Sequence, residues 1–188
     1  MNAILSEETV GVMGSGTDEY EELAREVGEL LAQLGVNLLT GGGRGVMRSV
    51  SRAFTQTERE RGICIGVIPC FSERERARPK DGYPNEFVEL AIYTHLPHSG
   101  ERGKEDLSRN HINVLSCSAI IALPGGPGTA SEVSLADEYA KPVIIYSPEA
   151  TLVKGFPQSV PRATTLKHVG QFLGKHRQRE PKPRGVDA

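Results

Sequence analysis

Apolar runs alternate along the chain with segments in which apolar residues recur at helical spacing. The run at 9–14 precedes a segment, 17–35, in which leucines and a valine recur every three or four residues before a glycine. This pattern predicts a strand followed by an amphipathic helix. Further strands are predicted at 36–40, 62–69, 119–123 and 142–146, and further helices at 46–54, 105–116 and 129–140.

The predicted strands are apolar throughout rather than alternating between apolar and polar positions. Strands of this kind suit a parallel sheet with both faces covered. The sequence therefore predicts an α/β fold of the doubly wound, Rossmann-like type, with a mostly parallel sheet and helices on both faces.

Two segments depart from this alternation. Residues 70–104 contain one plausible strand, at 87–93, between charged and Pro/Gly-bearing stretches. A connection of this length is usually functional, so we interpret it as a candidate lid inserted into a single domain at 1–173. Residues 174–188 are polar and proline-bearing, which is typical of a flexible tail.

Composition narrows the classes of partner. The 188 residues include 22 basic and 24 acidic side chains, for a formal net charge of −2, so no global field favours nucleic acid or an anionic membrane. No apolar run is long enough to span a membrane, and the N-terminal residues lack the pattern of a secretory signal. The three cysteines form no CxxC pair, so we expect a cytoplasmic protein without a metal site.

Glycine-rich turns at 14–17, 41–45 and 124–129 each lie between a predicted strand and a predicted helix. Ligands of parallel α/β sheets collect at such strand ends, where helix N-termini attract anions. Glycine also lets an anion approach backbone amides closely. One such loop would need no explanation beyond turn geometry, but several loops together indicate a phosphate site. The dinucleotide fingerprint and the Walker A motif are both absent, which favours a compact phosphate ester over NAD.

Three segments carry a family resemblance: LLTGGGRGVM at 38–47, SRNHINVLSCSAIIALPGGPGTASEVSLA at 108–136 and KPVIIY at 141–146. They resemble the superfamily once labelled lysine-decarboxylase-like, which includes the Lonely Guy phosphoribohydrolases and the molybdenum cofactor carrier proteins. The resemblance implies a Rossmann-like fold, binding of a phosphorylated purine or pterin, and a homodimer or homotetramer. The run GVMGSG and the short loop GGGRGVM look more like the carrier branch, whereas ALPGG is the Lonely Guy wording.

Two functions of different classes follow from this resemblance. The first, which we favour, is a binding protein that carries or stores the molybdenum cofactor and delivers it to a molybdoenzyme or a cofactor-insertion protein. The alternative is a hydrolase that cleaves the N-glycosidic bond of nucleoside 5′-monophosphates and needs no cofactor. A nucleotide sensor is a minor third hypothesis.

The candidate ligand-binding residues lie in the three glycine turns and near the predicted helix at 105–116. They are Gly14, Ser15, Gly42, Gly43, Arg44, Gly45, Arg109, Asn110, Gly125, Gly126, Gly128, Thr129 and Glu132. An arginine gives a phosphate bidentate, permanently charged recognition.

Glu132 has two interpretations. Thr129 as N-cap and Glu132 three residues later form the pattern of a capping box, in which each side chain bonds the other's backbone amide. The resemblance instead implies that Glu132 assists N-glycosidic cleavage, with Arg109 at the spacing of the catalytic arginine of the hydrolase branch. In a hydrolase, Arg109 and Glu132 would therefore be the catalytic residues.

Overall fold

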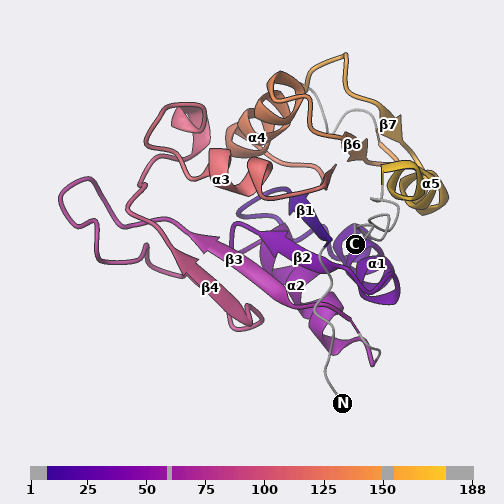
Figure 1. Ribbon diagram of the computed structural model, residues 1–188, viewed down its shortest axis with the longest axis horizontal. Coiled ribbons are helices and arrows are strands. Elements are labelled where there is room, and N and C mark those ends of the chain that lie inside the picture. The colour runs from indigo at the N-terminus through magenta and orange to yellow at the C-terminus, as the bar shows by residue number, and fades with distance from the viewer. Residues whose placement is uncertain (1–7, 59–60, 150–154, 177–188) are drawn as a thin grey trace, which may run out of the picture.

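The computed structural model describes residues 8–58, 61–149 and 155–176. Within them the strands form one seven-stranded sheet in the order β4-β3-β2-β1-β5-β6-β7, and every pairing is parallel (Figure 1). The strands are β1 (Thr9–Met13), β2 (Asn37–Thr40), β3 (Cys64–Ile68), β4 (Leu90–Tyr93), β5 (Ala119–Ala122), β6 (Val143–Tyr146) and β7 (Arg162–Ala163). The helices are α1 (Glu21–Gln33), α2 (Val46–Gln56), the 3₁₀ turn η1 (Gly100–Arg102), α3 (Asn110–Leu115), α4 (Pro127–Glu138) and α5 (Leu166–His176).

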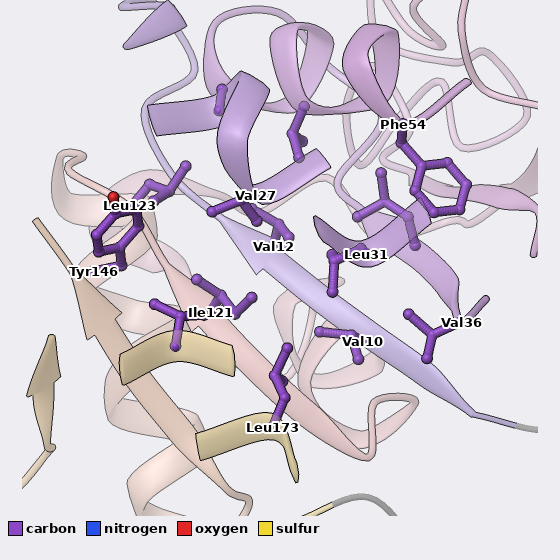
Figure 2. Packing of buried hydrophobic residues seen from close by; sticks show 14 of the residues in the cluster. Val10, Val12, Val27, Leu31, Val36, Phe54, Ile121, Leu123, Tyr146 and Leu173 are labelled. Carbon is purple, nitrogen blue, oxygen red and sulfur yellow. The ribbon is translucent and has the colours of Figure 1, made fainter. Parts of the chain in front are cut away.

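The two faces of the sheet bury separate apolar clusters. Helices α1, α2 and α5 pack on one face, while α3 and α4 pack on the other. Val10 and Val12 of β1 point toward Val27 and Leu31 of α1 (Figure 2), because alternate residues of a strand share a face and residues four apart share a helix face. The structure thus confirms the predicted doubly wound α/β fold.

The strand order places a switch point between β1 and β5. From β1 the chain builds outward through β2, β3 and β4, and β5 then returns to the other side of β1. The turns that follow β1 and β5 are therefore neighbours, and ligands of open α/β sheets bind at such a position.

Three helices begin at residues other than the predicted ones, and the first is α1, which begins at Glu21 rather than 17. Helix α3 begins at Asn110 rather than 105, because residues 105–108 form a turn in which the Ser108 amide donates to the Glu105 carbonyl at 2.9 Å. Helix α4 begins at Pro127 rather than 129, since proline is favoured at the first position of a helix.

The other comparisons with the sequence prediction concern the long connection and the C-terminal part of the chain. The predicted strand at 87–93 is present as β4, whereas β7 and α5 have no counterpart in the sequence prediction. Residues 174–176, placed by the sequence in the tail, are the last residues of α5; residues 177–188 lie outside the described residues. None of the described helices combines the length and apolarity needed to cross a bilayer.

Candidate functional site

The three glycine turns meet at the carboxyl ends of β1, β2 and β5. The backbone amide of Ser15 donates to the carbonyl of Pro124 at 3.0 Å, and the amide of Val46 donates to the carbonyl of Ser15 at 2.9 Å. The turn after β1 is therefore fastened to both of the others.

Two glycines permit this close approach. Gly45 has a φ of +61°, and a Cβ at this position would lie 2.5 Å from the Ser15 carbonyl oxygen. A Cβ on Gly125 would collide with the Thr129 hydroxyl and lie 2.8 Å from the Ser15 amide nitrogen. Both positions require glycine because the neighbouring backbone fills the space of a side chain.

A cavity of about 290 Å³ opens where the turns meet. The end of β1 with the turn after it forms one wall, through residues 12–17, and the start of α4 forms another, through residues 126–129. The other lining residues are Gly41, Met47, Tyr83, Ser99, Gly100, Arg109, Asn110 and Glu132.

Eight of the thirteen candidate residues line this cavity: Gly14, Ser15, Arg109, Asn110, Gly126, Gly128, Thr129 and Glu132. The other five, Gly42, Gly43, Arg44, Gly45 and Gly125, do not.

Gly41 lines the cavity, but the rest of the turn after β2 does not, and the long connection packs on Gly42 and Gly43. A Cβ on Gly42 would meet Ile68, and one on Gly43 would lie 2.6 Å from the ring of Tyr83. Asn85 holds this arrangement, since its backbone amide donates to the Gly42 carbonyl at 2.8 Å and its side-chain amide donates to the Gly43 carbonyl at 2.9 Å.

Arg109 is the cation of the cavity. It directly precedes α3, and the residue is 5% exposed. Its Nε and Nη1 atoms are buried without a hydrogen-bond partner, and no ion pair of Arg109 occurs among the described residues. Gly41 makes room for the guanidinium, because a Cβ there would lie 2.5 Å from Nη1. Buried N–H donors without hydrogen-bond partners are costly, which favours an anion beside this guanidinium.

Glu132 is the carboxyl group of the cavity, and the predicted capping box is wrong. Gly126 is the N-cap and makes no side-chain cap bond, so Thr129 lies inside the first turn of α4. The Glu132 Oε1 atom instead accepts a hydrogen bond of 2.8 Å from the side-chain amide of Asn113 on α3. Burial raises the pKa of Glu132, while the charge of Arg109 and the Asn113 bond partly oppose that rise.

The first turn of α4 supplies backbone donors. Ala130 makes the first i to i−4 bond of this helix, to the Gly126 carbonyl, so the amides of Gly128 and Thr129 precede the ladder. The positive end of the helix dipole reinforces them. Ser15 has a different role, because its amide bonds Pro124 and its hydroxyl accepts from the Asp18 amide at 2.9 Å and contacts the Asp18 carboxylate at 3.0 Å.

Sequence reasoning did not single out Tyr83, Ser99 and Gly100 as site residues. All three belong to residues 70–104, which spread over the left side of Figure 1. The Ser131 hydroxyl of α4 donates to the Gly100 carbonyl at 3.1 Å, which holds this part of the connection against the cavity. The only sequence signal was the unusual length of the connection, because no periodic pattern marks these residues. Throughout residues 8–58, 61–149 and 155–176, His, Cys, Asp and Glu side chains form no group arranged to hold a metal ion.

Several known proteins are similar to this chain in sequence or in structure. An uncharacterised protein from Archaeoglobus fulgidus is 31% identical over 145 residues, which cover 76% of this chain and 82% of that protein. The molybdenum cofactor binding protein from the phototrophic bacterium Rippkaea orientalis is 30% identical, with a TM-score of 0.65 over 89% of this chain and 96% of its own. The Moco carrier protein from Chlamydomonas reinhardtii is 30% identical, with a TM-score of 0.64 over 89% and 98%. Residues 7–174 match the SLOG cluster4 family, and the chain therefore belongs to this Lonely Guy-like family.

Proposed function

We propose that this protein binds a phosphorylated pterin of the molybdenum cofactor type and serves as its carrier or store. The observation that carries the proposal is the buried guanidinium of Arg109, a residue that lines the cavity and whose Nε and Nη1 atoms have no hydrogen-bond partner. A phosphate would bond this guanidinium bidentately and accept from the amides of Gly128 and Thr129.

The choice of a pterin rests on kinship. The solved structures at 30% identity are described as a molybdenum cofactor binding protein and a Moco carrier protein. The cavity volume of about 290 Å³ is near the lower end of the range of about 300–1,000 Å³ for small-molecule sites. It accommodates the phosphate and the adjoining part of such a ligand. In this carrier the long connection, which supplies Tyr83, Ser99 and Gly100 to the wall, would act as the lid.

The test is recovery of the ligand from the protein. The full chain is purified from a bacterial host that makes the cofactor, then denatured and oxidised, and the released pterin is measured by its fluorescence. We expect pterin with the unaltered protein and with an Arg25→Met control on the surface of α1, but little with Arg109→Met. Absence of pterin from the unaltered protein, together with no affinity for inorganic phosphate, would refute the proposal.

The hydrolase is the second candidate, because Glu132 lines the same cavity as Arg109. A buried carboxyl with a raised pKa is suited to proton transfer. Incubation with AMP, followed by measurement of free base and ribose 5-phosphate, tests this function. Release that disappears in Glu132→Gln, with the fold retained, would establish the enzyme; no release from the unaltered protein would exclude this activity toward AMP.

We further propose a cytoplasmic homodimer or homotetramer that passes its ligand to a molybdoenzyme or a cofactor-insertion protein. The edge strand β4 supports self-association, since Leu90, Ile92 and Tyr93 are exposed there. Exposed apolar edge strands tend to be covered by another chain. Light scattering behind size exclusion measures the mass, and a monomer at every concentration would refute this part.

A further inference from the structure

A groove of about 660 Å³ adjoins the cavity. Its walls come from the turns after β1 and β2 and from residues 82–86 of the long connection. It shares Thr17 and Tyr83 with the cavity. The groove is more than twice as large as the cavity, so a ligand whose phosphate lies in the cavity can place a fused ring system beyond Tyr83.

A second depression adjoins the cavity at Ser99, and its charged side chains other than Arg74 are already paired. The ring nitrogens of His98 lie 2.9 Å from a Glu73 oxygen and 3.0 Å from a Glu105 oxygen. Arg102 pairs with Glu105 at 2.8 Å. No Phe or Tyr lines this depression, so the groove is the better place for a planar ring.

Tyr83 is held in position between the two spaces. Its ring packs on Gly43, and the guanidinium carbon of Arg109 lies 5.8 Å from the ring centroid. The two bonds from Asn85 to the turn after β2 fix the backbone beside it. Since the ring is only partly buried, it offers a preorganised platform on which a heterocycle can stack.

Arg44 is a cation of this groove without a carboxylate partner among the described residues. Gly82, with a φ of +81°, lets the side chain lie against the backbone, because a Cβ there would be 3.0 Å from Nε. The neighbouring Arg48 is neutralised: its Nε donates to Glu86 at 3.0 Å, and Glu19 lies 3.9 Å from its Nη1. The guanidinium of Arg44 therefore remains available to a ligand.

A guanidinium has five N–H donors and no acceptor, which selects among heterocycles. It bonds bidentately to a ring carbonyl oxygen and an adjacent ring nitrogen, as it does to guanine. Oxidised pterins such as neopterin present the same pair of acceptors, whereas adenine carries an amino group in place of the carbonyl. We propose that the groove binds the 2-amino-4-oxopyrimidine ring shared by pterins and guanine. The ring stacks on Tyr83 with its carbonyl edge toward Arg44. This proposal rests on the proposed function, because it takes the phosphate to lie in the cavity.

Calorimetry with GMP, AMP and ribose 5-phosphate tests the proposal on the full chain. Neopterin monophosphate is measured by its own fluorescence, which the chain does not obscure because it contains no tryptophan. We expect GMP and neopterin monophosphate to bind at least about fivefold more tightly than AMP, the lower limit for one bidentate pair. Comparison of these two ligands tells whether a pterin or a guanine nucleotide is preferred.

Variants assign this preference to residues. Arg44→Ala should bring GMP and AMP to within about twofold of each other, because the discrimination of one bidentate pair is lost. Tyr83→Leu should weaken GMP more than Tyr83→Phe does, since phenylalanine keeps the stacking surface. Arg25→Ala, on the surface of α1, should match the unaltered protein.

Two results would overturn the proposal, and they are distinguishable. If ribose 5-phosphate binds but AMP binds as tightly as GMP, or Arg44→Ala leaves their ratio unchanged, the groove proposal fails and the phosphate site stands. If neither ribose 5-phosphate nor inorganic phosphate binds, the proposed function and the groove proposal fail together.

Discussion

Replacing Arg109 with methionine should stabilise the ligand-free protein while it abolishes anion binding. The substitution keeps an unbranched side chain of similar length but removes the buried Nε and Nη1 donors that have no partner. An unsatisfied buried polar group costs about 1–3 kcal/mol, and more when it is charged. Two such donors therefore imply a penalty of at least about 2 kcal/mol in the native state.

Favourable interactions of Arg109 offset part of this penalty. The guanidinium lies over the Tyr83 ring, an arrangement that contributes about 0.5–2 kcal/mol. It also attracts the carboxyl group of Glu132. With the penalty at its lower limit, the Tyr83 contact leaves a net gain of about 0–1.5 kcal/mol for Arg109→Met, and for a chain of this size each kcal/mol raises Tm by about 2–4 °C.

Thermal unfolding in phosphate-free buffer, repeated with added inorganic phosphate, measures both effects. Phosphate should raise the Tm of the unaltered protein and leave that of Arg109→Met unchanged, because a ligand stabilises only the state that binds it. Arg25→Met is the control. It removes an exposed surface ion pair with Glu29, and this loss should change the free energy of unfolding by less than about 0.5 kcal/mol. A fall in Tm of Arg109→Met without phosphate would refute the reasoning, because Arg109 would then be a structural residue.

Three further predictions concern the turns, the carboxyl group and the thiols. Gly125→Ala should lower stability and phosphate affinity because the added Cβ collides with Thr129. Gly126→Ala should leave the free energy of unfolding nearly unchanged, because no atom lies within 4 Å of the added carbon. Equal losses of stability in the two variants would contradict this prediction. Since burial raises the pKa of Glu132, its contribution to stability is present at low pH and is lost as pH rises through the folded-state pKa. Glu132→Gln should therefore match the unaltered protein below the ordinary pKa of glutamate and exceed its urea midpoint at higher pH, and a constant difference would contradict the assignment. Burial raises the pKa of Cys64 to about 11 and that of Cys117 to about 12, so neither thiol should react with Ellman's reagent at pH 8 until urea unfolds the chain; rapid native reaction would contradict their burial.

The sequence predicted the fold well because continuous apolar strands and amphipathic helices are local signals. The strand order explains why turns far apart in the chain meet, since β1 lies between β2 and β5. The start of α4 was misplaced because the segment from Thr129 to Glu132 fits a capping box, although Pro127 directly before it is a competing start signal. Because α4 starts at Pro127, Glu132 lies beyond the first turn of the helix, where it lines the cavity instead of capping the helix.

The parts of the site that sequence could not predict depend on contacts between distant segments. Tyr83 lines the cavity because Asn85 bonds the carbonyls of Gly42 and Gly43, and nothing in the local pattern of 70–104 signals this pairing. For the same reason the turn after β2 could not be distinguished from the turn after β5. Both are glycine-dense, yet the turn after β2 contributes only Gly41 to the cavity wall, whereas the turn after β5 contributes residues 126–129.

This difference assigns separate tasks to the glycine turns. The turn after β2 fixes the walls, because Gly41 makes room for Arg109, Gly43 for Tyr83 and Gly45 for the backbone of the turn after β1. The turn after β5 presents the first-turn amides of α4 to the cavity. Substitutions of Gly41 and Gly43 should therefore change affinity by displacing Arg109 and Tyr83, with a loss of stability. Those at positions 126 and 128 should change affinity while stability is retained. Affinity and unfolding midpoint measured on the same variants would separate the two tasks, and proportional losses at every position would show that the turns act as one unit.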